Sequence, residues 1–306
     1  MCGNSCLPPI GIKIYYVEPM NAPAVAKDIR KPFKGKALYQ PSGKAAEYSP
    51  WAVNFYTGCS NDCDYCYCKR GVMSHVWDNK PHLKKCFKNE EAALRTLCKE
   101  IEPNLNDLRK KGILFSFTTD PLLPETRVLT FASMASANYL RIPVKVLSKR
   151  ADFLYRIPEY LDKKLVAFGF TLTGSDELEP GASSNQERIE AMRALNKMGF
   201  KTWASIEPVI SVEKSLEMIK STLGFCDLYK VGLMSGVKNN YYDPRDFYDL
   251  IIALSNLSNE GVKIYPKDSL IEAIGSNREI LNDEWDANFV KADYNIFNSS
   301  NFKRLE

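Results

Sequence analysis

The amino-acid sequence predicts an α/β fold built around a parallel β-sheet. Runs of aromatic and β-branched residues alternate with amphipathic segments of helical spacing, and this pair repeats six or seven times. A strand followed by a helix, repeated in this way, is typical of parallel strands joined by right-handed crossovers. The count falls short of the eight strands of a full barrel.

The composition is that of a soluble globular protein. The chain has 306 residues, 45% hydrophobic and 25% charged, enough for one large domain with a small appendage. Lys and Arg number 41 and Asp and Glu 37, so the net charge of +4 is too small to require a nucleic-acid partner. We find no apolar run near the ~18 residues of a membrane span, and residues 1–10 lack the pattern of a signal peptide. Nine unevenly spaced cysteines do not resemble a secreted disulfide framework and predict a reducing, cytoplasmic setting.

The chain divides into three predicted regions. Residues 1–50 form an irregular N-terminal extension, because prolines interrupt every periodic pattern. The core spans residues 51–265. Residues 266–306 form a short C-terminal extension, whose Asn-rich end beyond Leu281 is expected to dock loosely. A basic run within 27–36 predicts a solvated surface or a phosphate-contacting arm.

Seven segments carry the aromatic and β-branched residues typical of strands. In chain order they are 51–56, 113–117, 143–147, 165–170, 202–206, 227–233 and 262–265. Segment 51–56 runs into a Thr-Gly pair, and 113–117 and 143–147 run into Thr118-Thr119-Asp120 and Ser148-Lys149-Arg150. Since functional residues in α/β barrels lie at the carboxyl ends of the strands, we expect these polar side chains at the functional face.

Six segments have apolar residues that repeat at helical spacing. In chain order they are 89–101, 126–140, 153–161, 184–198, the segment around Val212, Leu216 and Ile219, and 247–257. Two glutamates suit the first turn of the first helix. Pro158 is expected to bend the third helix. Ser184 and Glu187 form a capping box that opens the fourth helix, and Gly199 can end it.

The densest chemical signal is segment 59–68, which holds four of the nine cysteines. Thiolates this close repel one another unless a cation holds them, so the segment predicts soft-metal or iron–sulfur chemistry. Cys59, Cys63 and Cys66 have the spacing C-x3-C-x2-C, with Tyr65 directly before the third cysteine. Such a loop can supply three thiolates to a 4Fe–4S cluster. One iron then lacks a protein ligand and is open, as at a catalytic metal site.

Two other metal sites fit the same cysteines. A zinc knuckle would pair Cys63 and Cys66 with a second pair, but Cys2 and Cys6 are distant and poorly spaced for that role. A closed cluster would recruit Cys68 as a fourth thiolate and leave no open iron. Otherwise Cys68 is a packed thiol at the start of the helix that follows the loop.

The cysteine loop resembles the signature of radical S-adenosylmethionine (SAM) enzymes, C-x3-C-x-aromatic-C. This resemblance implies a partial (β/α)6 TIM-type barrel, a 4Fe–4S cluster on Cys59, Cys63 and Cys66, and SAM chelated to the open iron. It also implies reductive cleavage of SAM to a 5′-deoxyadenosyl radical that abstracts hydrogen from a substrate. In such enzymes the protein supplies orientation and excludes water. Tyr65 is expected to pack beside the adenine.

Several strand ends resemble proteins related to spore photoproduct lyase, over most of residues 50–235. The matching segments are Asn54 to Cys59, Thr119-Asp120-Pro121, Leu147-Ser148-Lys149, and Leu178-Glu179-Pro180-Gly181 followed by Arg188. The resemblance implies that Thr119 and Asp120 lie near the SAM amino group and that Lys149 meets the SAM carboxylate. Thr171, at the next strand end, would touch the ribose or methionine part. No side chain is assigned a catalytic role.

One position departs from that group. The repair enzyme carries a hydrogen-donating cysteine where this chain has Phe117, so photoproduct repair by that mechanism is not expected. Nucleic acid remains the leading substrate, by analogy with the group and because of the basic run. The predicted substrate contacts at later strand ends are Glu207, Tyr229, Lys230 and Lys267.

We expect a reductant protein of the flavodoxin or ferredoxin type as partner, no membrane, and a monomeric state. Two alternative hypotheses assign the chain to a class other than a lyase-like radical SAM enzyme. One is a non-catalytic module that binds zinc or a closed iron–sulfur cluster through the cysteines of 59–68. The other is a nucleic-acid-binding protein with a vestigial cluster, whose binding would depend on salt and survive loss of the cysteines.

Overall fold

A computed structural model describes residues 32–234, 243–278 and 289–298 of the chain. Its centre is an eight-stranded sheet in the order β1-β2-β5-β6-β7-β8-β9-β10. The strands are β1 (Leu38–Tyr39), β2 (Ala52–Val53), β5 (Ile113–Phe115), β6 (Val144–Ser148), β7 (Val166–Thr171), β8 (Lys201–Ile206), β9 (Leu228–Val231) and β10 (Ile264–Pro266). All neighbouring pairs are parallel except β1 and β2, and β1 and β10 are the two ends of the sheet. The α/β class and the partial barrel are therefore confirmed.

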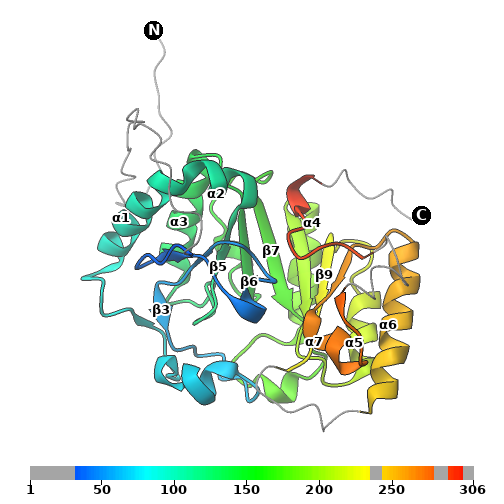
Figure 1. Ribbon diagram of the computed structural model, residues 1–306. Coiled ribbons are helices and arrows are strands. Elements are labelled where there is room, and N and C mark those ends of the chain that lie inside the picture. The colour runs from blue at the N-terminus through cyan, green and yellow to red at the C-terminus, as the bar shows by residue number, and fades with distance from the viewer. Residues whose placement is uncertain (1–31, 235–242, 279–288, 299–306) are drawn as a thin grey trace.

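The described residues form seven α-helices, with α1 to α3 on one flank of the sheet and α5 to α7 on the other (Figure 1). They are α1 (Glu90–Ile101), α2 (Leu105–Lys111), α3 (Arg127–Tyr139), α4 (Asn185–Lys197), α5 (Val212–Lys220), α6 (Pro244–Asn259) and α7 (Asp268–Ala273). The predicted capping box of α4, formed by Ser184 and Glu187, is present. Asn89 caps α1, where its side chain accepts from the backbone N–H of Ala92. Helices α2 and α7 were not predicted. No described helix combines the length and the apolar character that crossing a membrane requires.

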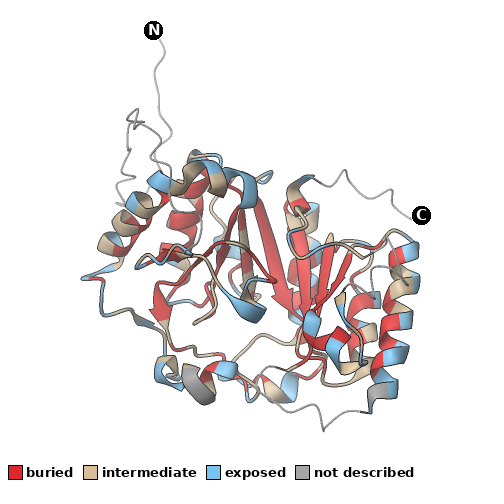
Figure 2. Cartoon of the chain, in the orientation of Figure 1, coloured by how far each residue is buried: buried red, intermediate tan, exposed pale blue. Residues whose placement is uncertain are grey.

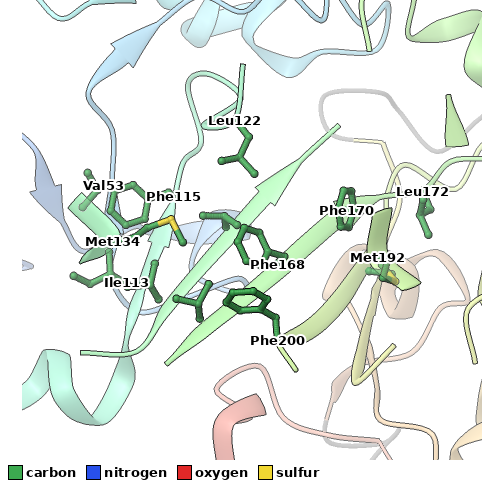
Figure 3. Close-up of a cluster of buried hydrophobic side chains, with 14 of the residues drawn as sticks. Val53, Ile113, Phe115, Leu122, Met134, Phe168, Phe170, Leu172, Met192 and Phe200 are labelled. Carbon is green, nitrogen blue, oxygen red and sulfur yellow. The ribbon is translucent and has the colours of Figure 1, made fainter. Parts of the chain in front are cut away.

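The main core fills the space between the outer face of the sheet and the helices, where the strands and inward helix faces are buried (Figure 2). Alternate residues of β7 point into it, and Phe168 and Phe170 stack on Phe153 at 5.6 and 6.1 Å between ring centroids. Phe200 meets Phe168 edge to face (Figure 3). This packing holds the outer face of the sheet against the helices, so the alternate residues of the strands point into the barrel.

The inner face carries a second, smaller cluster around Trp203. A Cβ at Gly169 would lie 2.2 Å from the Trp203 ring, so glycine leaves the room that this ring fills. Ile296 is 1% exposed in the same cluster, and the Val290 N–H donates to the Ile264 carbonyl. The described part of the C-terminal tail thus packs into the barrel, and the expectation of loose docking is wrong for it.

Two predicted elements differ in the structure. Segment 153–161 forms only a 3-10 turn, η5 (Leu154–Arg156), because Ile157 precedes a proline and takes an extended conformation. Segment 51–56 splits into β2 and β3 (Tyr56–Thr57). The second piece leaves the sheet and pairs with β4 (His82–Leu83). This excursion carries the chain past the carboxyl ends of the parallel strands (Figure 1).

Candidate cluster and cofactor site

A cavity of about 630 Å³ opens at the carboxyl ends of the parallel strands. Its walls come from the N-terminal segment 39–48, the cysteine loop, and the ends of β5 to β10. Every side chain that the sequence predicted for the cluster and for SAM lines it. These are Cys59, Cys63, Tyr65, Cys66, Thr119, Asp120, Lys149 and Thr171. The parallel sheet therefore brings together residues that lie as far as 112 positions apart (171 − 59 = 112).

The cysteine loop is held where it enters the site. The Gly58 N–H donates to the Val76 carbonyl and the Cys59 N–H to the Asp78 carbonyl, at 2.9 Å each. Gly58 has a φ of +78°, and a Cβ there would lie 2.1 Å from the carbonyl oxygen of Lys80, so only glycine fits. The loop thus enters the cavity through a fixed turn.

The cysteines of the loop are free thiols at the edge of the cavity. Burial and the charge of Asp120 raise the pKa of the Cys59 thiol to about 12, and burial raises the pKa of Cys63. A hydrogen bond from Cys68 lowers the pKa of Cys66 to about 6. Within the described ranges, no group of three or more Cys, His, Asp or Glu is arranged to hold a single metal ion. A cubane binds each thiolate through a different iron, and its positive charge favours the ionised form of buried thiols.

Asp120 is occupied by the protein itself. Its carboxylate accepts from the Asn61 side chain, the Lys149 N–H and the Ser148 hydroxyl at 2.7 Å each, and from the Leu122 N–H at 3.0 Å. It therefore ties the cysteine loop to the ends of β5 and β6. Because the buried Asp120 carboxylate already accepts these four hydrogen bonds, it can accept few more from a ligand.

Two buried polar atoms beside Asp120 have no hydrogen-bond partner among the described residues. They are the Thr119 hydroxyl and the side-chain carbonyl of Asn61, and both residues line the cavity. A buried polar atom without a partner is costly, so such atoms mark places where a ligand or ion supplies the missing contact. Asn61 lies between the first two cysteines, but sequence reasoning assigned it no role.

Lys149 follows the end of β6, and its side chain lies next to Tyr65 and Thr171. Its Nζ is 3.4 Å from the Thr171 hydroxyl and 5.4 Å from the centre of the Tyr65 ring. Burial by itself would lower the pKa of Lys149, but the charges of Cys63 and Glu179 outweigh burial and raise it. The side chain therefore carries a positive charge into the cavity.

The far end of the cavity is lined by Glu207 and Lys267. The Lys267 Nζ donates to Glu207 at 2.7 Å, and the Tyr48 hydroxyl donates to the same carboxylate. Lys230 lies deeper and donates to backbone carbonyls, including that of Tyr48, so it does not line the cavity. Tyr229 is on the outer face, 2.9 Å from the Thr222 hydroxyl, and the prediction that it contacts substrate is wrong.

Phe117 and Tyr48 form the apolar part of this end of the cavity. Their rings meet edge to face at 6.0 Å, and the Tyr67 hydroxyl donates to the Phe117 carbonyl. Tyr48 comes from the N-terminal segment that the sequence predicted as an irregular extension. No sequence pattern reveals this contribution, because the contact partners of Tyr48 lie far along the chain.

The chain matches the model of a known protein family. Residues 53–226, more than half of the 306, match the family described as the Radical SAM superfamily. The matched region contains all eight predicted site residues.

Two curated proteins are similar to this chain, and both are named as uncharacterized. One is ORF301 of Acidianus two-tailed virus, 27% identical over 229 residues, which cover 64% of this chain and 73% of that protein. The other is MJ0683 of Methanocaldococcus jannaschii, 25% identical over 189 residues, which cover 58% and 68%.

A similar solved structure is that of Streptococcus suis SuiB bound to S-adenosylmethionine, with a TM-score of 0.50 and 13% identity. The match covers 72% of this chain and 51% of SuiB, so it spans about half of that protein. At this identity the likeness concerns the fold of the chain.

Proposed function

The chain belongs to the radical SAM superfamily, and from this we propose that it is a lyase-like enzyme of the spore photoproduct lyase-like group that acts on nucleic acid. Its cofactors are those of the superfamily, a 4Fe–4S cluster and SAM. When bound and reduced, they supply a 5′-deoxyadenosyl radical that abstracts hydrogen from the substrate. The protein's own residues have to hold the cofactors, place the substrate and exclude water.

Cys59, Cys63 and Cys66 would hold the cluster. The support is the donor set itself, three thiols on one short loop at the edge of a cavity that is large enough for a cofactor and a substrate group. Cys68 would remain a thiol, because it is already engaged as the hydrogen-bond partner of Cys66. That arrangement leaves one iron without a protein ligand.

Thr119, Asn61 and Lys149 would hold SAM. The unpartnered oxygens of Thr119 and Asn61 can accept from the amino group, and the Lys149 ammonium can pair with the carboxylate. Thr171 and the Tyr65 ring flank Lys149 and would touch the nucleoside part. Asp120 would act indirectly, because its carboxylate already accepts four hydrogen bonds from the protein.

The substrate would enter at the end formed by Phe117, Tyr48 and Glu207. Aromatic faces suit the stacking of a base, and a carboxylate accepts N–H groups of a base edge. Support for nucleic acid comes from this chemistry and from the resemblance of the strand-end motifs. Phe117 cannot donate a hydrogen atom as a thiol does, so we propose base modification or lesion processing by a route other than the repair enzyme's.

One observation carries the proposal: all eight predicted residues line a single cavity. The test is anaerobic reconstitution with iron and sulfide, reduction with dithionite, addition of SAM, and detection of 5′-deoxyadenosine by mass spectrometry. We expect the product from the wild-type chain and its loss in Cys63→Ala. Cys86→Ala is the matched control, because Cys86 is exposed and does not line the cavity, and it should behave like wild type.

Product formation that survives Cys63→Ala would refute the cluster assignment. Stoichiometric zinc, or a four-thiolate cluster that shows no spectral change with SAM, would instead support the non-catalytic metal-binding reading. A radical enzyme also needs an electron donor, and we propose a flavodoxin- or ferredoxin-type protein.

The nucleic-acid substrate is tested separately. The rate of 5′-deoxyadenosine formation from SAM is measured in four separate reactions. These contain irradiated duplex DNA, unirradiated duplex DNA, RNA, or heparin, a polyanion that lacks bases. We expect at least one nucleic acid to raise the rate and heparin to leave it unchanged. Equal rates with all four additions would refute the substrate class and leave the radical chemistry standing.

A further inference from the structure

The cysteine loop is supported from behind by a buried ion pair. Glu179 follows the short turn η6 (Asp176–Leu178), and Arg188 lies in the first half of α4. Arg188 Nη2 donates to one carboxylate oxygen of Glu179, and the Tyr65 hydroxyl donates to the other. Both side chains of the ion pair are 0% exposed. Glu179 therefore links a residue of the cysteine motif to a helix of the barrel.

The backbone of the same turn also contacts the loop. The Asp64 N–H donates to the Leu178 carbonyl at 2.9 Å, and the Gly181 N–H donates to the Asn61 carbonyl at 3.1 Å. A Cβ at Gly181 would lie 2.1 Å from the Ser60 carbonyl oxygen, so the two segments touch at van der Waals distance. The turn after β7 and the cysteine loop thus form one packed unit.

Arg188 is itself held rigidly. Its Nη1 donates to the Thr171 carbonyl at 2.6 Å and its Nε to the Ser183 carbonyl at 2.9 Å. These bonds fix the guanidinium against the end of β7, the strand that carries Thr171 into the cavity. Because the N–H groups of a guanidinium lie in one plane, an arginine held in this way allows a bound carboxylate only one orientation.

A fully buried ion pair is weak evidence for a stabilising role. The cost of removing two charges from water is often as large as their attraction, and apolar residues of similar volume serve stability equally well. Here the ion pair fixes the position of the Glu179 carboxylate oxygen to which the Tyr65 hydroxyl donates. Tyr65 in turn lies between Cys63 and Cys66 and faces Lys149.

We propose that Glu179 is a positioning residue for the cofactor site, which acts through the Tyr65 hydroxyl to set the position of the cysteine loop relative to Lys149 and Thr171. This inference rests on the proposed function, because it concerns the same cluster and SAM. Glu179 touches neither cofactor under this proposal. Its effect on them passes through the hydrogen bond to Tyr65.

The test uses the full chain, reconstituted anaerobically, with readouts other than turnover. Iron per chain and the electron paramagnetic resonance (EPR) spectrum of the reduced cluster are recorded during a titration with SAM. The variants are Tyr65→Phe, which keeps the ring, Glu179→Gln, and the double variant. Asp176→Asn is the matched control, because Asp176 is the other carboxylate near Arg188, at 3.7 Å, and is 53% exposed.

We expect Tyr65→Phe to keep its iron and to need about tenfold more SAM for the spectral change, the effect of one lost hydrogen bond to a charged group. Glu179→Gln should show at least the same shift, and the double variant no more than Glu179→Gln alone. Asp176→Asn should match wild type.

Iron content, EPR spectrum and SAM titration that are unchanged in Tyr65→Phe would overturn the proposal, even if Glu179→Gln fails to fold. Additive effects in the double variant would also overturn it. A wild-type chain without a SAM-responsive cluster would instead refute the proposed function, so the two failures are distinguishable.

Discussion

Thr119 and Asp120 are neighbours in the sequence, yet the structure gives them different tasks. The Asp120 carboxylate is used by four protein donors, whereas the Thr119 hydroxyl is buried without a partner in the described part of the chain. The family resemblance implies the same end of SAM for both residues, because a motif at a strand end identifies a position and not the orientation of a side chain. The hydroxyl is the group that remains available to a ligand.

Replacing this hydroxyl should separate binding from stability. Thr119→Val removes no hydrogen bond within the described structure, so we expect the unfolding free energy to change by less than about 1 kcal/mol. The SAM dissociation constant should rise about tenfold. Thr222→Val is the control with the opposite pattern, because the Thr222 hydroxyl is 2.9 Å from the Met218 carbonyl, remote from the cavity. Urea unfolding and SAM titration check both; a Thr119 variant that is unstable but binds normally would contradict the assignment.

Lys145 predicts a pH dependence of stability. It lies on the inner face of β6, its Nζ donates to the Tyr48 carbonyl, and burial lowers its pKa from 10.5 to about 8. Between these two values the folded chain binds fewer protons than the unfolded chain. Stability therefore rises with pH in this window, by at most about 1.4 kcal/mol per pH unit.

Lys145→Met should abolish this increment. The difference in unfolding free energy between variant and wild type should shift in favour of wild type as the pH rises from 7.5 to 9.5. Burial and then the charge of Lys145 lower the pKa of Lys230, so Lys145→Met also relieves part of that lowering, and both effects shift the comparison in the same direction. Urea titrations at the two pH values measure it, and a difference that does not change with pH would show that Lys145 keeps an ordinary pKa.

At the scale of elements, long periodic segments were predictable and short ones were not. Helix α4 could be predicted because its capping box and its apolar repeat both lie within the segment. Segment 153–161 has the same repeat, but Pro158 and the stacking of Phe153 on β7 decide its conformation. Tertiary packing determines such a short segment, and the sequence does not display it.

The first strand shows how a distant element can determine a local structure. Glu100 of α1 accepts from the N–H groups of Lys36, Ala37 and Leu38 at 2.6 to 3.0 Å. These three donors directly precede or begin β1, the antiparallel edge of the sheet. The Glu100 carboxylate thus accepts the hydrogen bonds that a further strand would accept if β1 were not at the edge of the sheet.

Removing that carboxylate should loosen the edge. Glu100→Ala is expected to destabilise the chain by about 2 kcal/mol, because it leaves three backbone donors without their acceptor. Glu91→Ala on the exposed face of α1 is the control and should change stability little. Urea unfolding, with limited proteolysis of segment 36–48, provides the measurement; equal stability of the two variants would refute the anchoring role.

At the scale of the molecule, the site combines local and distant contributions. The cysteine motif, Thr119, Lys149 and Thr171 could be predicted because each lies in a short segment at a strand end. Tyr48, Glu47 and their partners could not, since Tyr48 and Glu207 are separated by 159 residues. Contacts over such distances depend on how the whole sheet curves, which no local pattern encodes.

The charges at the far end of the cavity should be coupled. Lys267 lies 2.7 Å from Glu207 and 3.6 Å from Glu47, and its side chain is 1% exposed. Glu207→Gln and Lys267→Met should each cost about 3 kcal/mol of unfolding free energy. The double variant should cost less than their sum by more than about 1 kcal/mol. The exposed pair Asp243 and Arg245 is the control, for which the coupling should stay below about 1 kcal/mol. Additivity at Glu207 and Lys267 would refute the pairing.

Glu47 and Asp268 meet across 221 residues, where the Asp268 N–H donates to the Glu47 carboxylate at 2.8 Å. A ribosome that adds ~5–20 residues per second needs roughly 10–45 s to make the intervening chain. During that interval the cysteines of the loop are already synthesised, while the wall opposite them does not yet exist. Iron and sulfide delivered during that interval would therefore reach the cysteine loop before the last strands that line the cavity have been made.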